Sequence, residues 1–287
     1  MSPVPQQIRC RQIGAEDIDT VVGLLTRGFP VRSRDFWVVT FQRLTAHPTP
    51  PGFPKYGYVL ACEGIPVGVI LLIFSTVIVE GETRIRCNVS SWYVEPIFRS
   101  YAAMLISHAL KHRNVTYFNI TPDRETLPIL EAQGYARYCT GRFVAVPLFS
   151  GRSGGPQVEV VGPNVCADDL PPFDRELLLT HADYGCISVT CRSDRRHPFV
   201  FFLRRRARVI PFAYLAYCRH VEEFVRFAGP LGRFLAQRGI PLVVLDSNGP
   251  IRGLVGRYLD GAPKYFKGPD QPRLGDIAYS ERVMFGV

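Results

Sequence analysis

Residues 89–110 read VSSWYVEPIFRSYAAMLISHAL and carry the strongest structural signal in this chain. The apolar run at 89–94 predicts a strand, and the apolar residues of 102–110 recur at the spacing of a helix. A short turn that contains Pro96 and Arg99 separates the two. The segment is therefore expected to run from a strand, through a turn, into the N-terminus of a helix.

The expected helix N-terminus near residue 102 suits an anion. The first backbone N–H groups of a helix have no partner within it, and the helix dipole places partial positive charge there. Arg99 and Ser100 could add a charged fork and a hydroxyl to a phosphate or pyrophosphate site. The alternative is an ordinary strand–helix junction with a solvated arginine, and the glycines of Walker and dinucleotide-binding patterns are absent.

The same stretch resembles the core motif of the GNAT superfamily of acyl-CoA-dependent N-acyltransferases. That motif is a strand ending in valine, then a proline, an aromatic–arginine pair and a loop that opens a helix. Val94, Pro96, Phe98 and Arg99 occupy these places in this sequence.

A second piece that looks like the family follows at the expected distance. The pattern predicts a strand over 115–120 and a helix over 123–133, closing with Gly134-Tyr135. This ending is similar to the family's LYEKLGF. The resemblance covers roughly residues 8–147 and lies mainly in the order of elements. It implies an α/β (α+β) fold, with a mixed central sheet flanked by helices.

The resemblance also implies a co-substrate, acetyl-CoA or another acyl-CoA, and an amine acceptor. The backbone N–H of Val94 would polarise the thioester carbonyl, and pantetheine would lie beside the strand. The cofactor-binding residues that the resemblance implies are Trp92, Tyr93, Val94, Arg99, Ser100, Tyr101, Ala102, Ala103 and Asp123.

Three residues are candidates for proton transfer. Ser90 and Ser91 alternate across the strand, so one of them faces the cleft and could relay a proton through water. Tyr135 could protonate the departing thiolate. The ordinary alternatives are a small polar strand residue for each serine and a core aromatic for the tyrosine. No metal is implied.

The sequence departs from the family at four positions. Asp123 stands where an asparagine is frequent at the start of the helix. Leu130 stands where the family often has the tyrosine that protonates the thiolate, and Ala102 and Met104 stand where glycines are usual. These departures keep a second hypothesis open, in which the chain is a non-catalytic acyl-CoA-binding or scaffold protein.

The second half weakly repeats the order helix, hairpin, strand, helix, strand. We therefore expect two tandem GNAT-like domains, 1–150 for acyl-CoA and 157–287 as a degenerate copy that forms the acceptor site or an interface. A glycine-rich run at 150–156 predicts the linker, with a surface loop inside one domain as the alternative. The helix expected over 221–237 should break at Gly229-Pro230.

Basic residues outnumber acidic ones, 34 to 25, and the net charge of +9 favours anionic partners. Arginines cluster at 192–208. The cluster could be a solvated hairpin or a docking surface for an anionic substrate or partner. A nucleic-acid partner is not expected, because no recognised motif accompanies them. Residues 264–269 and 275–281 are either a wall of the acceptor site or a C-terminal strand pair.

The eight cysteines form no CxxC pairs, which argues against zinc ribbons and favours buried, reduced thiols. No N-terminal signal segment is apparent, and the apolar stretch 65–79 is too short and too β-branched to span a bilayer. We therefore expect a cytoplasmic protein with a small-molecule or amine acceptor, which could be anionic, no membrane partner and a possible homodimer.

Overall fold

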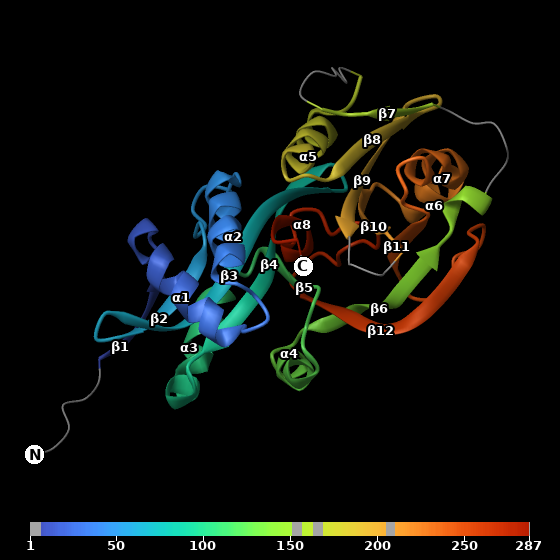
Figure 1. The fold of residues 1–287 in the computed structure, drawn as a ribbon. Helices are drawn as coiled ribbons and strands as arrows, with labels where there is room; N and C mark the ends of the chain where they lie inside the picture. The colour runs from blue at the N-terminus through green and yellow to red at the C-terminus, as the bar shows by residue number, and fades with distance from the viewer. Residues whose placement is uncertain (1–6, 151–156, 163–168, 205–209, 287) are drawn as a thin grey trace, which may run out of the picture.

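The computed structural model describes residues 7–150, 157–162, 169–204 and 210–286. Twelve strands form one mixed sheet in the order β1-β2-β3-β4-β5-β12-β6-β11-β10-β9-β8-β7, and helices cover its faces (Figure 1). The predicted mixed central sheet flanked by helices is confirmed.

The first half contains the strand, turn and helix predicted over 89–110 and the strand and helix predicted over 115–133. Its elements are β1 (Ile8–Gln12), η1 (Ala15–Asp17), α1 (Ile18–Gly28), α2 (Arg34–Ala46), β2 (Gly57–Cys62), β3 (Ile65–Val79), β4 (Glu82–Val94), η2 (Pro96–Tyr101), α3 (Ala102–Ala109), β5 (Val115–Asn119), η3 (Arg124–Thr126), α4 (Leu127–Ala132), β6 (Ala136–Ala145) and η4 (Pro147–Phe149).

The second half contains the predicted hairpin and a divided helix. Its elements are β7 (Val158–Val160), α5 (Pro172–Asp183), β8 (Ile187–Arg192), β9 (Arg196–Arg204), β10 (Phe212–Cys218), α6 (Val221–Arg226), α7 (Ala228–Ala236), β11 (Leu242–Ser247), β12 (Gly256–Lys267) and α8 (Glu281–Met284). The helix breaks at Phe227, three residues before Pro230, because a proline is tolerated in the first turn of a helix.

The two halves exchange strands at the centre of the sheet. β12 pairs with β5 and β6, and β6 also pairs with β11. Strands β1 to β5 and β7 to β11 follow the same pattern, three antiparallel pairings and then one parallel pairing. The division at 150 and 157 stays a prediction, and the linker expected there lies outside the described residues except for Ser150.

Strand β3 pairs with β2 and β4 and is covered on both faces, which explains its unbroken apolar sequence. One of its faces packs against α3 and the other against α1 and α2, so both need apolar side chains. Among the described residues, no helix combines the length and the apolar character needed to cross a membrane.

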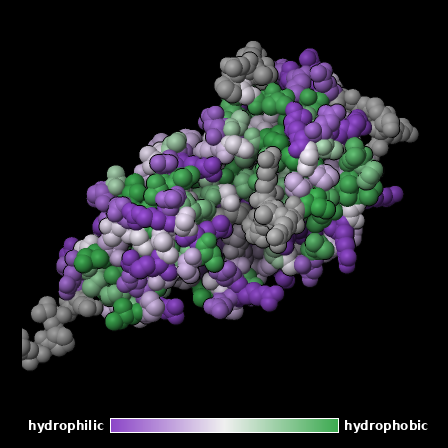
Figure 2. All heavy atoms as spheres, in the orientation of Figure 1, coloured by the Kyte–Doolittle hydropathy of each residue, from purple (hydrophilic) through white to green (hydrophobic). Residues whose placement is uncertain are grey.

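Hydrophilic and hydrophobic residues are interspersed over the face of both halves seen in Figure 2. Six of the seven described cysteines are buried, all seven carry free thiols, and several belong to the apolar clusters, as the sequence predicted. The short helix α8 lies at the centre of Figure 1 beside β4 and β5, although it comes from the C-terminal end of the described chain.

Candidate active site

The parallel strands β4 and β5 separate part of the way along their length. They pair from Ile85 opposite Val115 to Asn88 opposite Phe118, and among the described residues the register ends there. β4 continues to Val94. Backbone groups of β4 beyond Asn88 are therefore not paired with β5 and can meet a ligand.

A β-bulge lies directly after this point. Ser90 opposes Leu71 and Tyr93 opposes Val69, so Ser91 and Trp92 together face the single residue Ile70. Ser91 has φ of 48°, a left-handed conformation in the strand. A bulge leaves its extra residue out of the ladder and re-aims the neighbouring groups, and bulges are frequent beside active sites.

The bulge gives a stability prediction. Ser91→Val is expected to lower the free energy of unfolding by about 1–3 kcal/mol, because a β-branched residue is strained at positive φ. Ser91→Gly should leave stability equal to or above that of the wild type. Thr83→Val, at an exposed position of the same strand, is the control. Denaturant unfolding measures all three, and equal losses for Ser91→Val and Thr83→Val would contradict the bulge geometry.

A cleft of about 360 Å³ opens between the separated strands. It is lined by residues from four parts of the chain. They include Phe29, Arg32, Phe36 and Trp37 from α1, α2 and their connection, Ser90, Ser91 and Trp92 from β4, Thr121, Asp123, Leu130 and Tyr135 from the segment after β5, and Glu281, Arg282 and Phe285 from the C-terminal segment.

Glu281 places a carboxylate inside this cleft. The side chain is buried, and its two oxygens accept hydrogen bonds from the hydroxyls of Ser90 and Thr121. Burial raises the pKa of Glu281 above its ordinary value, while the hydrogen bonds from Ser90 and Thr121 and the charges of Arg282 and Lys264 oppose the rise. A carboxylate with a raised pKa is suited to accept a proton.

One face of β4 holds the segment that carries Glu281. Successive side chains on this face are Arg86, Asn88 and Ser90. Arg86 Nη2 lies 2.9 Å from both a carboxylate oxygen of Asp276 and the carbonyl of Ala278. The side chain of Asn88 accepts from the backbone N–H of Glu281 at 2.5 Å and donates to the Phe118 carbonyl at 3.1 Å. These contacts fix residues 276–281 along the strand.

Five of the predicted site residues meet in the cleft: Ser90, Ser91, Trp92, Asp123 and Tyr135. The others lie elsewhere. Tyr93 packs with the α1–α2 cluster, Val94 is buried in the α3 cluster, Arg99, Ser100 and Tyr101 are exposed on η2, and Ala102 and Ala103 begin α3.

The expected phosphate loop differs from the open turn that the sequence suggested. Residues 96–101 form the 3₁₀ helix η2, in which the N–H of Phe98 bonds to the carbonyl of Glu95. The N–H of Ala102 in turn bonds to Arg99. These two N–H groups are therefore occupied, and of the predicted anion site the exposed side chains of Arg99 and Ser100 remain as candidates.

Sequence reasoning missed the individual roles of Glu281 and Arg282. The segment 275–281 was a candidate wall of the acceptor site because its composition is chemically varied. The structure brings its last residue into the cleft, and the polar face of β4, with Arg86, Asn88 and Ser90, holds the segment there. Lys264, from the other candidate stretch, is buried and lies 2.8 Å from Asp246.

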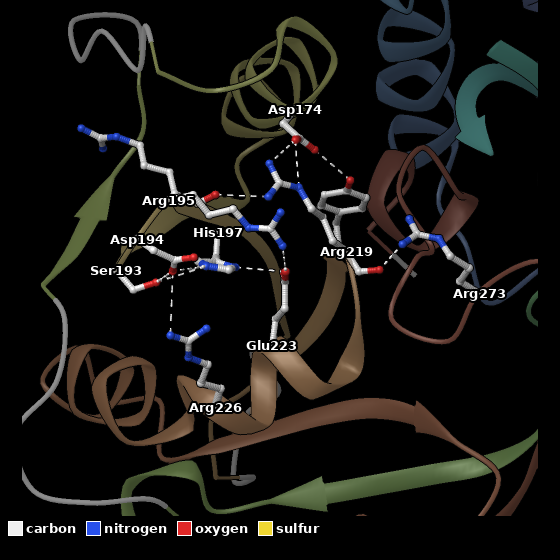
Figure 3. Close-up of polar contacts among 11 residues, drawn as sticks. Asp174, Ser193, Asp194, Arg195, His197, Arg219, Glu223, Arg226 and Arg273 are labelled. Atoms are coloured by element: carbon white, nitrogen blue, oxygen red, sulfur yellow. Dashed lines mark hydrogen bonds and ion pairs between the residues drawn. The ribbon is translucent and has the colours of Figure 1, made fainter. Parts of the chain in front are cut away.

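The arginine cluster of the second half is largely paired in its described part. Figure 3 shows Arg195 beside Glu223, at 3.3 Å, and Arg219 beside Asp174, at 2.6 Å. Arg196 pairs with Glu159 and Asp169. These arginines hold the hairpin and its neighbours together, while residues 205–209 lie outside the described residues and the side chain of Arg204 is not described.

Ser193, His197 and Glu223 superficially resemble a nucleophile relay in Figure 3. His197 Nε2 lies 3.3 Å from Ser193 Oγ and its Nδ1 lies 3.0 Å from Glu223. However, the Ser193 hydroxyl donates to Asp194, and Ser193 is exposed on the hairpin turn. The arrangement is better explained as a turn held to α6 by its polar side chains.

A second cavity, of about 600 Å³, lies beside this network and is lined by apolar side chains such as Val77 and Phe173 together with polar and charged ones. The arginines at its edge are already bound, Arg86 and Arg273 to Asp276 and Arg219 to Asp174. Because their charges are compensated, this cavity does not offer the free donors that an anionic ligand needs.

No protein-family model and no curated protein sequence matches the chain. Solved structures do resemble it. A GCN5-related N-acetyltransferase from Anabaena variabilis has 12% sequence identity and a TM-score of 0.60, over 91% of this chain and 72% of that one. A GCN5-related N-acetyltransferase from Kribbella flavida has 13% identity and a TM-score of 0.60, over 93% and 72%.

A putative acetyltransferase from Pyrococcus horikoshii has 13% identity and a TM-score of 0.58, and the match spans 97% of this chain and 96% of that one. Likeness at this identity establishes the fold. The chain therefore has the GNAT fold that the sequence predicted, and the likeness extends over most of its length.

Proposed function

We propose that this protein is an acyl-CoA-dependent N-acyltransferase, which moves an acyl group, acetyl in the simplest case, from a CoA thioester to an amine. The observation that carries the proposal is the buried carboxylate of Glu281 in the cleft beside the β4 bulge. The fold supports it, because the similar structures named above are N-acetyltransferases or putative acetyltransferases. A scaffold protein would have no need for a carboxylate held there by two hydroxyls.

The bulge supplies the electrostatic part of the reaction. Its backbone N–H groups, at Ser91 and Trp92, are the donors we assign to the thioester carbonyl, in place of the N–H of Val94. An N–H fixed by the strand can stabilise the negative charge that develops on this oxygen without reorganising.

Glu281 supplies the base. The attacking amine forms a C–N bond to the carbonyl carbon, its proton passes to the Glu281 carboxylate, and the C–S bond then breaks to release CoA as a thiolate. Ser90 and Thr121 orient the carboxylate through their hydrogen bonds. Tyr135 lines the cleft, and its hydroxyl is the donor we assign to the thiolate in the absence of a tyrosine at Leu130. Burial raises its pKa, which makes it a weaker acid than a free tyrosine.

The proposal is tested by incubating the purified chain with acetyl-CoA and a panel of amines while recording thiol release and the mass of the acylated product. Amine-dependent thiol release with a matching product supports transfer. Tight binding of acetyl-CoA without release with any amine would instead support the non-catalytic alternative, and no binding would contradict both.

Arg99 gives a second prediction about the co-substrate. Arg99→Gln is expected to weaken acetyl-CoA binding roughly 10-fold, because an exposed arginine contributes one charge-assisted contact to a phosphate. The dissociation constant, measured by calorimetry, checks this. Arg113→Gln removes the same charge from the exposed connection between α3 and β5 and should change little. An equal effect of both variants would remove Arg99 from the phosphate site.

A further inference from the structure

We propose that the acceptor is a small amino carboxylate, of amino-acid size, whose amine faces Glu281 and whose carboxylate binds Arg282. This inference rests on the proposed function and names the substrate class of the same cleft.

Arg282 is a buried cation without a partner. Its side chain lines the cleft, the residue is 6% exposed, and it forms no hydrogen bond or ion pair with any described residue. Its guanidinium carbon lies 4.5 Å from the centre of the Tyr214 ring, so the described contact of its charged end is with an aromatic face. A buried guanidinium without a counter-ion is costly, so the free protein is expected to hold a place for an anion.

Apart from the carboxylate of Glu281, whose charge acts on Arg282 without forming an ion pair, the described surroundings of Arg282 do not neutralise it. Arg142 Nη1 bonds to the hydroxyl of Tyr214 at 2.9 Å and pairs with no described carboxylate. Lys264 is neutralised by Asp246. Burial alone would raise the pKa of Tyr214, yet Arg282, Arg142 and Lys264 together hold it below its ordinary value. The wall of the cleft behind Arg282 therefore carries excess positive charge.

Three buried atoms of the cleft are donors without a hydrogen-bond partner among the described residues. The indole nitrogens of Trp37 and Trp92 are buried without a hydrogen-bond partner, as is Nε of Arg282, and all three residues line the cleft. Indole and guanidinium groups donate hydrogen bonds and cannot accept them. Their complement is a ligand rich in acceptor oxygens, which the carbonyls of an acyl-CoA and the carboxylate of an acceptor both provide.

Three features select a small amino carboxylate among anionic amines. The planar fork of a guanidinium matches a carboxylate with two parallel hydrogen bonds. Glu281 and Arg282 are adjacent in the chain and line the same cleft, so one small molecule can reach both. The cleft volume of about 360 Å³ lies near the lower end for ligand pockets, and the acyl group must share it.

The test compares each of the twenty proteinogenic amino acids with its carboxamide, which keeps the amine and removes the negative charge. Calorimetry first measures acetyl-CoA binding, which reports on the proposed function alone. Thiol release and equilibrium binding to the CoA-loaded protein are then measured for each pair. We expect at least one amino acid to bind and react roughly 10- to 100-fold better than its amide.

Variants then locate the recognition. Arg282→Gln should raise KM for that amino acid by about 10- to 100-fold and change KM for its amide far less, while the Kd for acetyl-CoA stays close to that of the wild type. Its effect on kcat, which includes the loss of a charge beside Glu281, should be shared by acid and amide. Arg282→Lys, which keeps the charge but loses the fork, should fall between, and Arg113→Gln is the control. The comparison of amino acids with their amides uses only the wild-type protein. It therefore still tests the inference if Arg282→Gln does not fold.

Two results would overturn the inference while sparing the proposed function. One is a wild-type protein that binds acetyl-CoA but uses amino acids and their amides equally well, or binds and acylates no amino acid. The other is an equal loss for acid and amide in Arg282→Gln. Absence of acetyl-CoA binding would overturn the proposed function and, with it, the inference.

Discussion

Glu281→Gln is expected to lower kcat for acyl transfer by about 10²- to 10⁴-fold, the range in which a positioned general base contributes. The amide has nearly the same shape and can keep contacts to Ser90 and Thr121, but it cannot take the proton of the amine. The Kd for acetyl-CoA should therefore stay close to that of the wild type. Steady-state kinetics and calorimetry measure the two quantities.

The pH dependence of the same variant is a second part of this result. The base acts in its ionised form, so kcat/KM of the wild type should rise with pH through the pKa of Glu281, which burial raises above its ordinary value of 4.5. In Glu281→Gln, this rise of kcat/KM at acidic pH should be absent. Because the folded protein holds this proton more tightly than the unfolded chain, wild-type stability should fall as pH rises through the same window, and the variant should not follow.

Glu125→Gln makes the same chemical change at an exposed position in η3 and serves as the control. It is expected to leave both kcat and the pH profile unchanged. Wild-type turnover in Glu281→Gln, with the rise of kcat/KM at acidic pH still present, would show that another group accepts the proton.

Asp276→Asn is expected to lower the free energy of unfolding by about 3–5 kcal/mol, since removing one partner of a buried ion pair leaves the other charge uncompensated. Asp276 is 2% exposed and its carboxylate lies 2.9 Å from Arg86 and 3.1 Å from Arg273. The change also loosens the segment that leads to Glu281, so kcat should fall together with stability. Denaturant unfolding at neutral pH measures the first effect.

The pH dependence of this loss has a defined sign. Burial would raise the pKa of Asp276, but Arg86 and Arg273 hold it below its ordinary value of 3.8. Its contribution to stability is therefore present at neutral pH and is lost only as the pH falls below that value. The difference between wild type and Asp276→Asn should shrink in acid.

Glu82→Gln is the control. It breaks the exposed ion pair between Glu82 and Arg84, at 3.9 Å, near the start of β4, the strand that also carries Arg86. It should change the free energy of unfolding by less than about 0.5 kcal/mol. A loss for Asp276→Asn no larger than this would mean that Asp276 does not hold the C-terminal segment on β4.

The sequence predicted the fold where its signals are local. The strand, turn and helix of 89–110 and the order of elements through Tyr135 follow from apolar periodicity and from the family resemblance. Periodicity cannot tell a 3₁₀ helix from an open turn over six residues, which is why η2 was missed. The exchange of β6 and β12 was also out of reach, because strand pairing between distant segments leaves no local pattern.

The sequence likewise predicted only the part of the candidate site that lies in local motifs. Ser90, Ser91, Trp92, Asp123 and Tyr135 lie within the matched motifs, and the cleft contains them. Glu281 is 191 positions away from Ser90, and only the folded chain brings its carboxylate to that hydroxyl. A single acidic residue at the start of a four-residue helix has no signature of its own in the sequence.

The most direct test of the central claim is a calorimetric titration of the purified protein with acetyl-CoA, on the wild type and on Ser91→Trp, which would fill the cleft beside the bulge. We predict micromolar binding at one site per chain for the wild type and loss of binding in a variant that remains folded by circular dichroism. Binding that survives unchanged in the folded variant, or no binding by the wild type, would contradict the assignment of this cleft to acyl-CoA.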